Sequence, residues 1–328
     1  MDFFQAIQKI VKPFNRKRYV WPLKLLVTAL FVYLVNKNLG YGRIRLFEIK
    51  LAAMPLVAVL VAGLANFFFQ VLRWQLVCKA YGMRIGAGLA VKTMLFGNLL
   101  AFVTPGKFGE LLRGMSIPAA KKSDTVVAVA FEKVCAGIAT VAAGIIAAAV
   151  HSSRHGITLG QTVIFAGGIC IAVATAAVVL LASGKNARKI LGRFCEEKVW
   201  PFAERFIPAT DAATLWGVIL YSIAAHLSVV CQTVFLFFMF GSPDISADIV
   251  CAFEAYAFMI FFPFFIANMG IREYSFKLFL SKAGAAPGAG AIAVLASVSV
   301  LAINMVLPAL AGLVWWLLES RKAAEDPA

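Results

Sequence analysis

The segment TPGKFGELLRG, residues 104–114, decides the fold, because it places Pro, Gly and three charged residues directly after a long apolar stretch. Thr followed by Pro suits the N-cap and the first position of a helix, so we expect Thr104 to cap a short helix that Gly114 stops. A second segment, NMGIREYSFK at residues 268–277, follows another apolar stretch, and Asn268 is its expected N-cap. Each segment therefore predicts a short helix that begins in or near a membrane.

The rest of the chain is strongly apolar. Of its 328 residues, 62% are hydrophobic and 14% are charged, against about 45–50% and 25% in soluble domains. This composition excludes a soluble globular protein, because it leaves too little polar surface. Two shorter apolar stretches, 85–103 and 249–267, run into the polar segments. A membrane-spanning helix needs about 20 apolar residues, and the candidates are residues 21–35, 51–77, 125–150, 161–182, 212–240 and 289–318.

The distribution of Lys and Arg predicts how these stretches cross the membrane, because cytoplasmic loops carry the excess of positive charge. The basic N-terminus, residues 1–20, is expected to be an interfacial segment on the cytoplasmic side. If every stretch crossed fully, the basic loop 184–208 would lie outside. If residues 85–103 and 249–267 instead form re-entrant hairpins, which enter and leave on the same side, this loop and the C-terminus are cytoplasmic. The basic loop 37–50 is then the main exception, because it lies outside.

The two halves of the chain correspond in pattern. Three pairs of equivalent positions are 161, 164 and 163 residues apart: Leu51 and Ala212, Thr125 and Ala289, and Glu110 and Glu273. We therefore divide one polytopic membrane domain, residues 1–328, into repeat one (21–150) and an inverted repeat two (161–318). The predicted fold is an all-α integral membrane protein with about six full transmembrane helices and two re-entrant helical hairpins. Paired interrupted helices of this kind are typical of transporters.

The two polar segments carry basic residues near the ends of the expected short helices. The N-terminus of a helix attracts anions through its free N–H groups and its dipole. Glu110 lies three residues before Arg113, and Glu273 lies four before Lys277, so each acid is expected to position a cation. We expect a lipid headgroup phosphate to bind to four cations: Lys107, Arg113, Arg272 and Lys277.

Further charges lie within apolar stretches, where each costs about 2.5–3.5 kcal/mol on insertion scales and usually serves function. Together with the acids of the two segments, we expect them to form a charge network around a central groove: Arg73, Glu110, Glu132, Lys133, Glu254 and Glu273. One structural alternative is that Glu110 neutralises Arg113 and that Glu132 neutralises Lys133. The alternative for Arg73 is a side chain that snorkels to a nearby interface.

Other classes of function lack their sequence signatures. The chain has no Walker loop and no His/Asp/Ser constellation, so neither catalysis, nor ATP-driven pumping, nor a cofactor is expected. His151 and His155 lie in an expected loop without a third ligand, and the six Cys are scattered without a CxxC, which argues against a metal site and disulfides. The 31 Lys and Arg sit in short clusters between apolar runs, which argues against a nucleic-acid partner.

A set of these residues together resembles a known family: Asn66, Arg73-Trp74, Thr104-Pro105, Gly109-Glu110, Arg113, Glu132-Lys133 and Gly270-x-Arg272-Glu273. Over nearly its whole length the chain resembles the lysylphosphatidylglycerol synthase transmembrane-region family, the flippase-like half of bacterial multiple-peptide-resistance proteins. Family members commonly have an Asp after the acidic–basic pair, whereas Val134-Cys135-Ala136 follow it here. The resemblance implies movement of an anionic lipid between leaflets. It does not imply lipid aminoacylation, which belongs to a soluble C-terminal domain that this chain is expected to lack.

We therefore expect a flippase or scramblase for an anionic lipid, such as a phosphatidylglycerol derivative or a polyprenyl-linked sugar. The expected location is the cytoplasmic (inner) membrane of a prokaryote, with both termini in the cytoplasm. One alternative is a membrane-embedded enzyme that acts on a lipid phosphate with Glu110 or Glu273 as base. The other is a non-transporting partner of a glycosyltransferase or lipid synthase. A lipid-modifying synthase or a glycosyltransferase is also the expected protein partner. The sequence is compatible with either a monomer or an oligomer.

Overall fold

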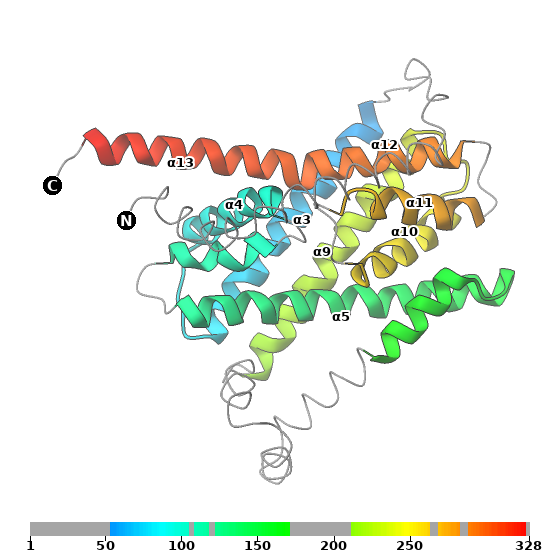
Figure 1. Ribbon diagram of the computed structural model, residues 1–328, viewed down its shortest axis with the longest axis horizontal. Coiled ribbons are helices and arrows are strands. Elements are labelled where there is room, and N and C mark those ends of the chain that lie inside the picture. The colour runs from blue at the N-terminus through cyan, green and yellow to red at the C-terminus, as the bar shows by residue number, and fades with distance from the viewer. Residues whose placement is uncertain are drawn as a thin grey trace, which may run out of the picture.

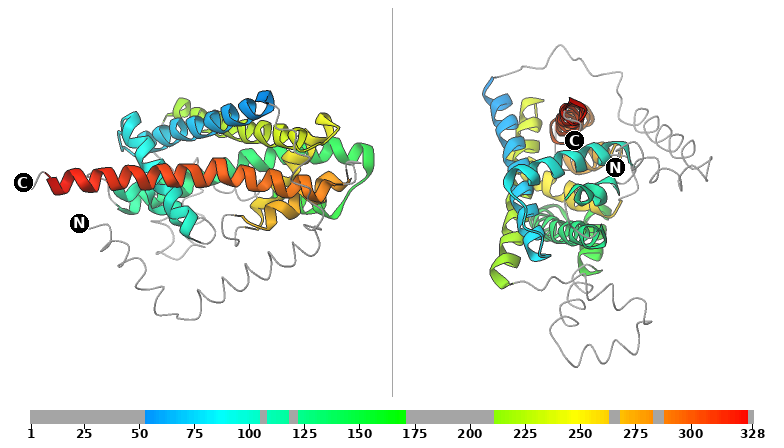
Figure 2. Two further views of the ribbon diagram at one scale, coloured as in Figure 1. Left: turned by 90° about the horizontal axis from the view of Figure 1, so that it is seen from above. Right: turned by 90° about the vertical axis from the view of Figure 1, so that its left-hand side faces the viewer.

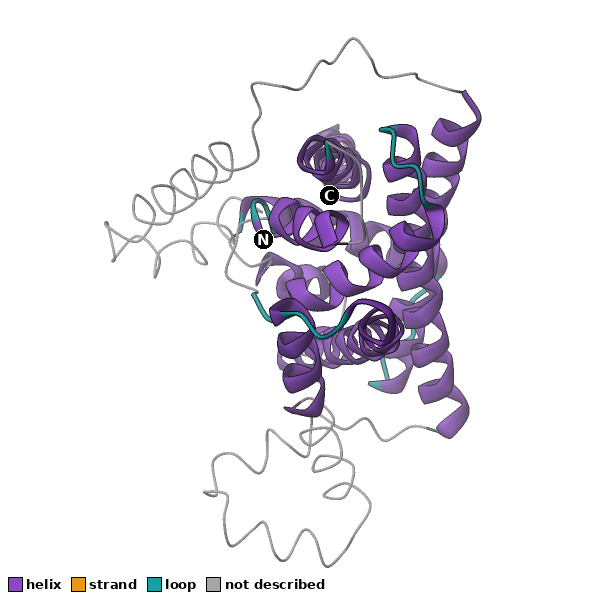
Figure 3. Cartoon of the chain, turned by 90° about the vertical axis from the view of Figure 1, so that its right-hand side faces the viewer, coloured by secondary structure: helices purple, strands orange, loops and turns teal. Residues whose placement is uncertain are grey.

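The computed structural model describes residues 53–104, 108–117, 122–170, 211–262, 268–282 and 288–325. Within these ranges the chain is helical and contains no strand (Figure 3), as the all-α prediction requires. In chain order (Figure 1), the elements are α3 (Ala53–Ala80), α4 (Ala87–Val103), the 3-10 helix η3 (Phe108–Ser116), α5 (Lys122–His155), the helix Leu159–Cys170, α9 (Ala212–Met239), α10 (Ile245–Ile260), α11 (Ile271–Lys282), α12 (Ala289–Leu301), the π-helical turn η4 (Ala302–Val306) and α13 (Leu307–Glu325).

Four helical stretches are long and apolar enough to cross a membrane. They are Ala53–Ala80, Lys122–Ser153, Ala212–Met239 and Ala289–Glu319, and they correspond to four of the six predicted spans. The span predicted at 161–182 is described only as far as Cys170. The span predicted at 21–35, the basic segment 1–20 and the loop 184–208 lie outside the described residues.

α3 and α9 pack side by side and form one face of the molecule (Figure 2). Each has 28 residues. They run antiparallel, because Gly63 lies against Gln232 near one end of the pair and Gly217 lies against Leu76 near the other. A Cβ atom at Gly63 would lie 2.7 Å from Ile303 Cγ2 and 2.8 Å from Gln232 Nε2, so glycine lets α3, α9 and η4 meet at this crossing.

α12, η4 and α13 follow one another as a single long helical rod (Figure 1). The π-helical turn η4 interrupts the rod where it passes α9, and Asn304 Nδ2 donates there to Gln232 Oε1 at 2.5 Å. Single π turns inside α-helices frequently occur at functional sites. Farther along, Lys92 of α4 forms an ion pair of 2.6 Å with Glu319 of α13.

Each half of the chain places a short helix and a polar break between two long apolar helices. α4 has 17 residues and leads through η3 to α5, while α10 has 16 residues and leads through α11 to α12. α10 begins after Asp244, whose Oδ1 accepts from the N–H groups of Ser246 and Ala247 at 2.9 and 3.1 Å. Hydrogen bonds from the Ser246 hydroxyl and these amides hold the pKa of Asp244 below its ordinary value.

Candidate functional site

Thr104 fixes the first polar segment against the end of α4. Its hydroxyl donates to the Leu100 carbonyl at 2.8 Å and accepts from the Gly109 N–H at 2.7 Å. A Cβ atom at Gly109 would lie 2.3 Å from the Leu100 carbonyl group, so this close approach requires glycine. Thr104 is the C-cap of α4 and not the N-cap of the short helix, which begins at Phe108 and runs to Ser116. The predicted N-cap at Thr104 and the predicted stop at Gly114 are therefore both wrong.

Five charged side chains from α3, η3 and α5 meet beside this segment. Glu132 lies between two arginines: its Oε1 accepts from Arg73 Nε at 2.9 Å and contacts Arg73 Nη2 at 2.7 Å, and its Oε2 pairs with Arg113. Lys133 pairs with Glu110. Glu132 and both arginines are less than 5% exposed, whereas the Lys133 side chain is 42% exposed. The cluster is therefore a buried Arg–Glu–Arg triad with a partly exposed Glu–Lys pair next to it.

This pairing corrects the two neutralising pairs that sequence spacing suggested. Glu132 and Lys133 are neighbours on α5, and successive residues of an α-helix point about 100° apart. Glu132 consequently faces α3, while Lys133 reaches Glu110 on η3. Arg73 is 4% exposed and bound to Glu132, so it does not snorkel to an interface.

Arg113 is enclosed by protein. Its guanidinium carbon lies 4.1 Å from the centre of the Trp74 ring, and its Nη1 lies 3.1 Å from Met94 Sδ. Trp74 is fixed in turn by its Nε1, which donates to Thr93 Oγ1 at 2.9 Å. A cation over an indole face is stabilised by the ring quadrupole, and more so when both are buried. Arg113 therefore supports the triad, whereas the sequence predicted that it binds a headgroup.

A polar cavity of about 250 Å³ lies beside the triad, and Arg73 lines it. On α3, Asn66, Gln70 and Arg73 occupy one helix face at i, i+4 and i+7. Gln70 Nε2 donates to Asn66 Oδ1 at 3.0 Å. The remaining polar lining comes from α5, α9, α10 and the turn before α11: Thr140, Ser222, His226, Tyr256 and Asn268. The cavity thus joins helices from both halves of the chain.

Two polar contacts hold the helices around the cavity. Thr140 Oγ1 of α5 lies 3.3 Å from His226 Nδ1 of α9, and Thr233 Oγ1 of α9 lies 2.8 Å from the Tyr256 hydroxyl of α10. Sequence reasoning missed Gln70, Thr140, Ser222 and Tyr256 as lining residues. The polar residues on one face of α3 were the signal that would have identified one wall of the cavity, because Asn66, Gln70 and Arg73 recur there at helical spacing within a largely apolar helix.

The second polar segment lies against α12. Glu273 Oε1 accepts from Ser297 Oγ at 2.7 Å, and its Oε2 accepts from the Gly270 N–H at 2.5 Å. An acid at the third helical position that bonds back to the N-cap N–H forms half of a capping box. Arg272 Nη1 donates to the Ser297 carbonyl at 3.3 Å. These contacts fasten the start of α11 to α12.

Asn268 does not cap α11, so that prediction is wrong. The helix begins at Ile271, which makes Gly270 the preceding residue. Asn268 has φ = 58°, in the left-handed region, whereas an N-cap residue usually has extended backbone. It lines the polar cavity instead.

The structure gathers only part of the predicted charge network. Glu254 lies with His151 at the far end of α5, and Glu273 lies with Ser297. Lys277 is half-buried on α11, one turn after Glu273, and Lys107 lies outside the described residues. Of the charged residues predicted for the site and described by the structure, only Arg73 lines the cavity. Within the described ranges, no three His, Cys, Asp or Glu side chains form a group that could hold a metal ion.

A comparison with known protein families confirms the family that the sequence resembles in its two polar segments and at Arg73 of α3 and Glu132 of α5. The family model described as "Lysylphosphatidylglycerol synthase TM region" matches residues 21–312. The comparison with curated proteins found no match. The family match and the four long apolar helices identify a multi-pass membrane protein. The chain belongs to the lysylphosphatidylglycerol synthase TM region family.

Proposed function

We propose that this protein moves an anionic lipid between membrane leaflets, with the headgroup passing through the polar cavity at Arg73. The observation that carries the proposal is the cavity itself, which is polar and lies between helices apolar enough to span a membrane. Its volume of about 250 Å³ equals that of roughly eight water molecules, which suits a small polar headgroup. A lipid headgroup that crosses the hydrocarbon core of a membrane loses its hydrogen bonds to water, which costs several kcal/mol. Polar side chains that line the cavity would lower this cost by forming hydrogen bonds with the headgroup.

The charge beside the cavity favours an anion. The cluster holds three cations and two anions, since Glu132 serves both Arg73 and Arg113 while Glu110 serves Lys133. One positive charge is therefore in excess at a buried place, where an uncompensated charge is costly. The contacts of Arg73 with Glu132 use Nε and Nη2, which leaves Nη1 for a ligand in the cavity. A phosphate there would neutralise the excess charge.

A lipid fits better than a soluble anion, because an apolar groove of about 600 Å³ runs beside the cavity. α9 borders both spaces: His226 and Val229 line the cavity, while Leu227 and Val230 line the groove. The His226 ring lies 5.5 Å, between ring centroids, from Phe253, which also lines the groove. An acyl chain in the groove would thus lie close to a headgroup in the cavity.

The arrangement of the helices supports an inverted repeat as the transport machinery. α3 and α9 are equal in length and antiparallel, and α12–α13 runs opposite to α5 (Figure 1). In each half a short helix and a polar break come between these long helices. Rocking of one repeat against the other would expose the cavity to each leaflet in turn, as in transporters built from inverted repeats.

We further propose that α4 and α10 belong to re-entrant hairpins in a prokaryotic cytoplasmic membrane, with both termini in the cytoplasm. With the six native Cys replaced, Ser123→Cys and Pro243→Cys are two exposed positions, at the start of α5 and in the turn before α10. In intact cells, an impermeant thiol reagent should label position 243 and leave position 123 unlabelled. The reverse pattern would mean that α4 crosses the membrane fully.

Leaflet exchange in proteoliposomes tests the proposed function. Vesicles with the purified protein should make fluorescent phosphatidylglycerol in the inner leaflet accessible to dithionite, and fluorescent phosphatidylcholine much more slowly. The recovered phosphatidylglycerol should be chemically unchanged. Conversion of the lipid without exchange would favour the embedded enzyme. The absence of both would favour a non-transporting partner of a synthase or glycosyltransferase.

A further inference from the structure

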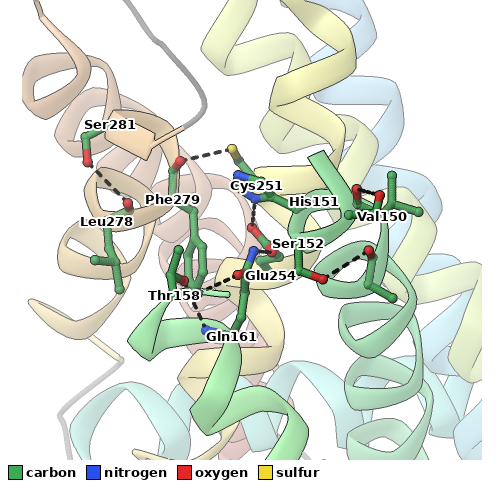
Figure 4. Close-up of polar contacts among 12 residues, drawn as sticks. Val150, His151, Ser152, Thr158, Gln161, Cys251, Glu254, Leu278, Phe279 and Ser281 are labelled. Carbon is green, nitrogen blue, oxygen red and sulfur yellow. Dashed lines mark hydrogen bonds and ion pairs between the residues drawn. The ribbon is translucent and has the colours of Figure 1, made fainter. Parts of the chain in front are cut away.

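A second buried polar group lies near the end of α5, whereas the triad lies nearer its start. Figure 4 shows this second group. Glu254 of α10 is 0% exposed, and both of its carboxylate oxygens are bonded. Oε2 lies 2.8 Å from His151 Nδ1, and Oε1 accepts from Gln161 Nε2 at 2.8 Å. His151 was expected in a loop, but it belongs to the last turns of α5 and is 5% exposed. Three separate helices thus converge on one buried carboxylate.

Among the described side chains, the two that bond to Glu254 carry no fixed positive charge. α5 contributes His151, the helix Leu159–Cys170 contributes the neutral amide of Gln161, and α10 itself contributes Cys251, whose thiol donates to the Phe279 carbonyl of α11 at 3.3 Å. The surrounding helices carry further titratable groups, which include Asp248 and Tyr256 on α10, His226 on α9, and Arg272, Glu273, Tyr274, Lys277 and Lys282 on α11. This environment is unlike that of Glu132, which is paired with two arginines.

The pair is neutral only when it holds one proton. The proton resides either on the imidazole, as Glu⁻ and His⁺, or on the carboxyl group, as GluH and neutral His. Without that proton the pair carries a net negative charge in a buried place, where net charge is costly. Buried ionisable side chains within membrane helices are commonly parts of proton relays.

We propose that the His151–Glu254 pair binds one proton and couples lipid movement to a transmembrane proton gradient, an inference that rests on the proposed function. α10 connects the two sites, because it carries Glu254 on the side of α5 and carries Tyr256, Met259 and Ile260 in the cavity lining. Glu132 and His151 are 19 residues apart on α5, which corresponds to roughly 28 Å along a helix. The proton and the headgroup therefore occupy separate sites joined by two helices.

The experiment uses proteoliposomes with fluorescent phosphatidylglycerol and an imposed gradient of about two pH units, which can shift a coupled equilibrium by up to about a hundredfold. In wild type, the steady-state ratio of labelled lipid between leaflets should shift several-fold with the gradient and return when a protonophore is added. Glu254→Gln mimics the protonated acid and can keep both hydrogen bonds, so we expect it to fold and to show the same ratio with and without the gradient.

Asp248→Asn is the matched control, since Asp248 is a buried acid on the same helix, bonded to Ser242 Oγ at 2.7 Å and without an imidazole partner in the described residues. It should respond to the gradient as wild type does. If Glu254→Gln is not recovered folded, His151→Asn replaces it with the same expectation. A gradient response in Glu254→Gln or His151→Asn, or none in a wild type that exchanges lipid, overturns the proton site. Absence of exchange in wild type under every condition overturns the proposed function instead.

Discussion

Glu132→Gln should be among the most destabilising single substitutions in this protein, lowering the free energy of unfolding by about 3–5 kcal/mol. The change removes the only acid that the structure places between Arg73 and Arg113, which are 4% and 1% exposed. Two buried guanidinium groups would then lose the acid that contacts both, and only Glu110, which pairs with Lys133, would remain near them. In detergent, the midpoint of thermal unfolding should fall by on the order of 10 °C.

The same substitution at a solvent-exposed ion pair provides the control. Glu319 pairs with Lys92, and the two side chains are 45% and 35% exposed, so Glu319→Gln should cost less than about 1 kcal/mol. Similar unfolding midpoints for Glu132→Gln and Glu319→Gln would contradict the view that the triad is a tightly coupled buried network.

Arg73→Gln should leave the free energy of unfolding nearly unchanged, in contrast to Glu132→Gln, and should strongly reduce the rate of lipid transport. The remaining Arg113–Glu132 pair is neutral, so no buried charge is left uncompensated. The cavity, however, loses the one Lys or Arg that the described residues contribute to its lining. A hydrogen bond to a charged group contributes about 1.5–3 kcal/mol, so exchange of fluorescent phosphatidylglycerol should fall roughly 10- to 100-fold.

The loss should depend on the charge of the lipid. Exchange of fluorescent phosphatidylcholine should be nearly unchanged in Arg73→Gln, because its headgroup carries no net charge. Gln70→Ala alters the same face of α3 without changing charge, so it should affect both lipids alike and by a smaller factor. An equal fall for both lipids in Arg73→Gln would show that the arginine serves the structure alone.

The positions of the long helices and the location of a charged site at the first polar segment were predictable from the sequence, because both depend on local composition. α3, α5 and α9 end within a few residues of the predicted limits, since apolar runs of this length have few other stable arrangements in a membrane. The site residues Arg73, Glu110 and Glu132 stood out because charge is rare in such runs.

The partners of these charges were not predictable, because they depend on how the helices face one another. Spacing along the chain suggested that Glu132 pairs with Lys133. In the structure, the packing of α5 against α3 and η3 places Glu132 beside Arg73 and Arg113 instead. The cavity depends in the same way on the facing sides of α3, α9 and α10. Asn268 was assigned to a helix cap, because the sequence does not reveal its left-handed φ.

The claim that an anionic headgroup enters the cavity can be tested by photocrosslinking with a phosphatidylglycerol that carries a diazirine on its headgroup. Mass spectrometry of the wild-type protein in vesicles should locate adducts on cavity residues from both halves of the chain, such as Gln70, Thr140 and Tyr256. Excess unlabelled phosphatidylglycerol should suppress these adducts, and phosphatidylcholine should not. Adducts confined to exposed apolar positions such as Phe68 and Leu220 would contradict a headgroup path through the cavity.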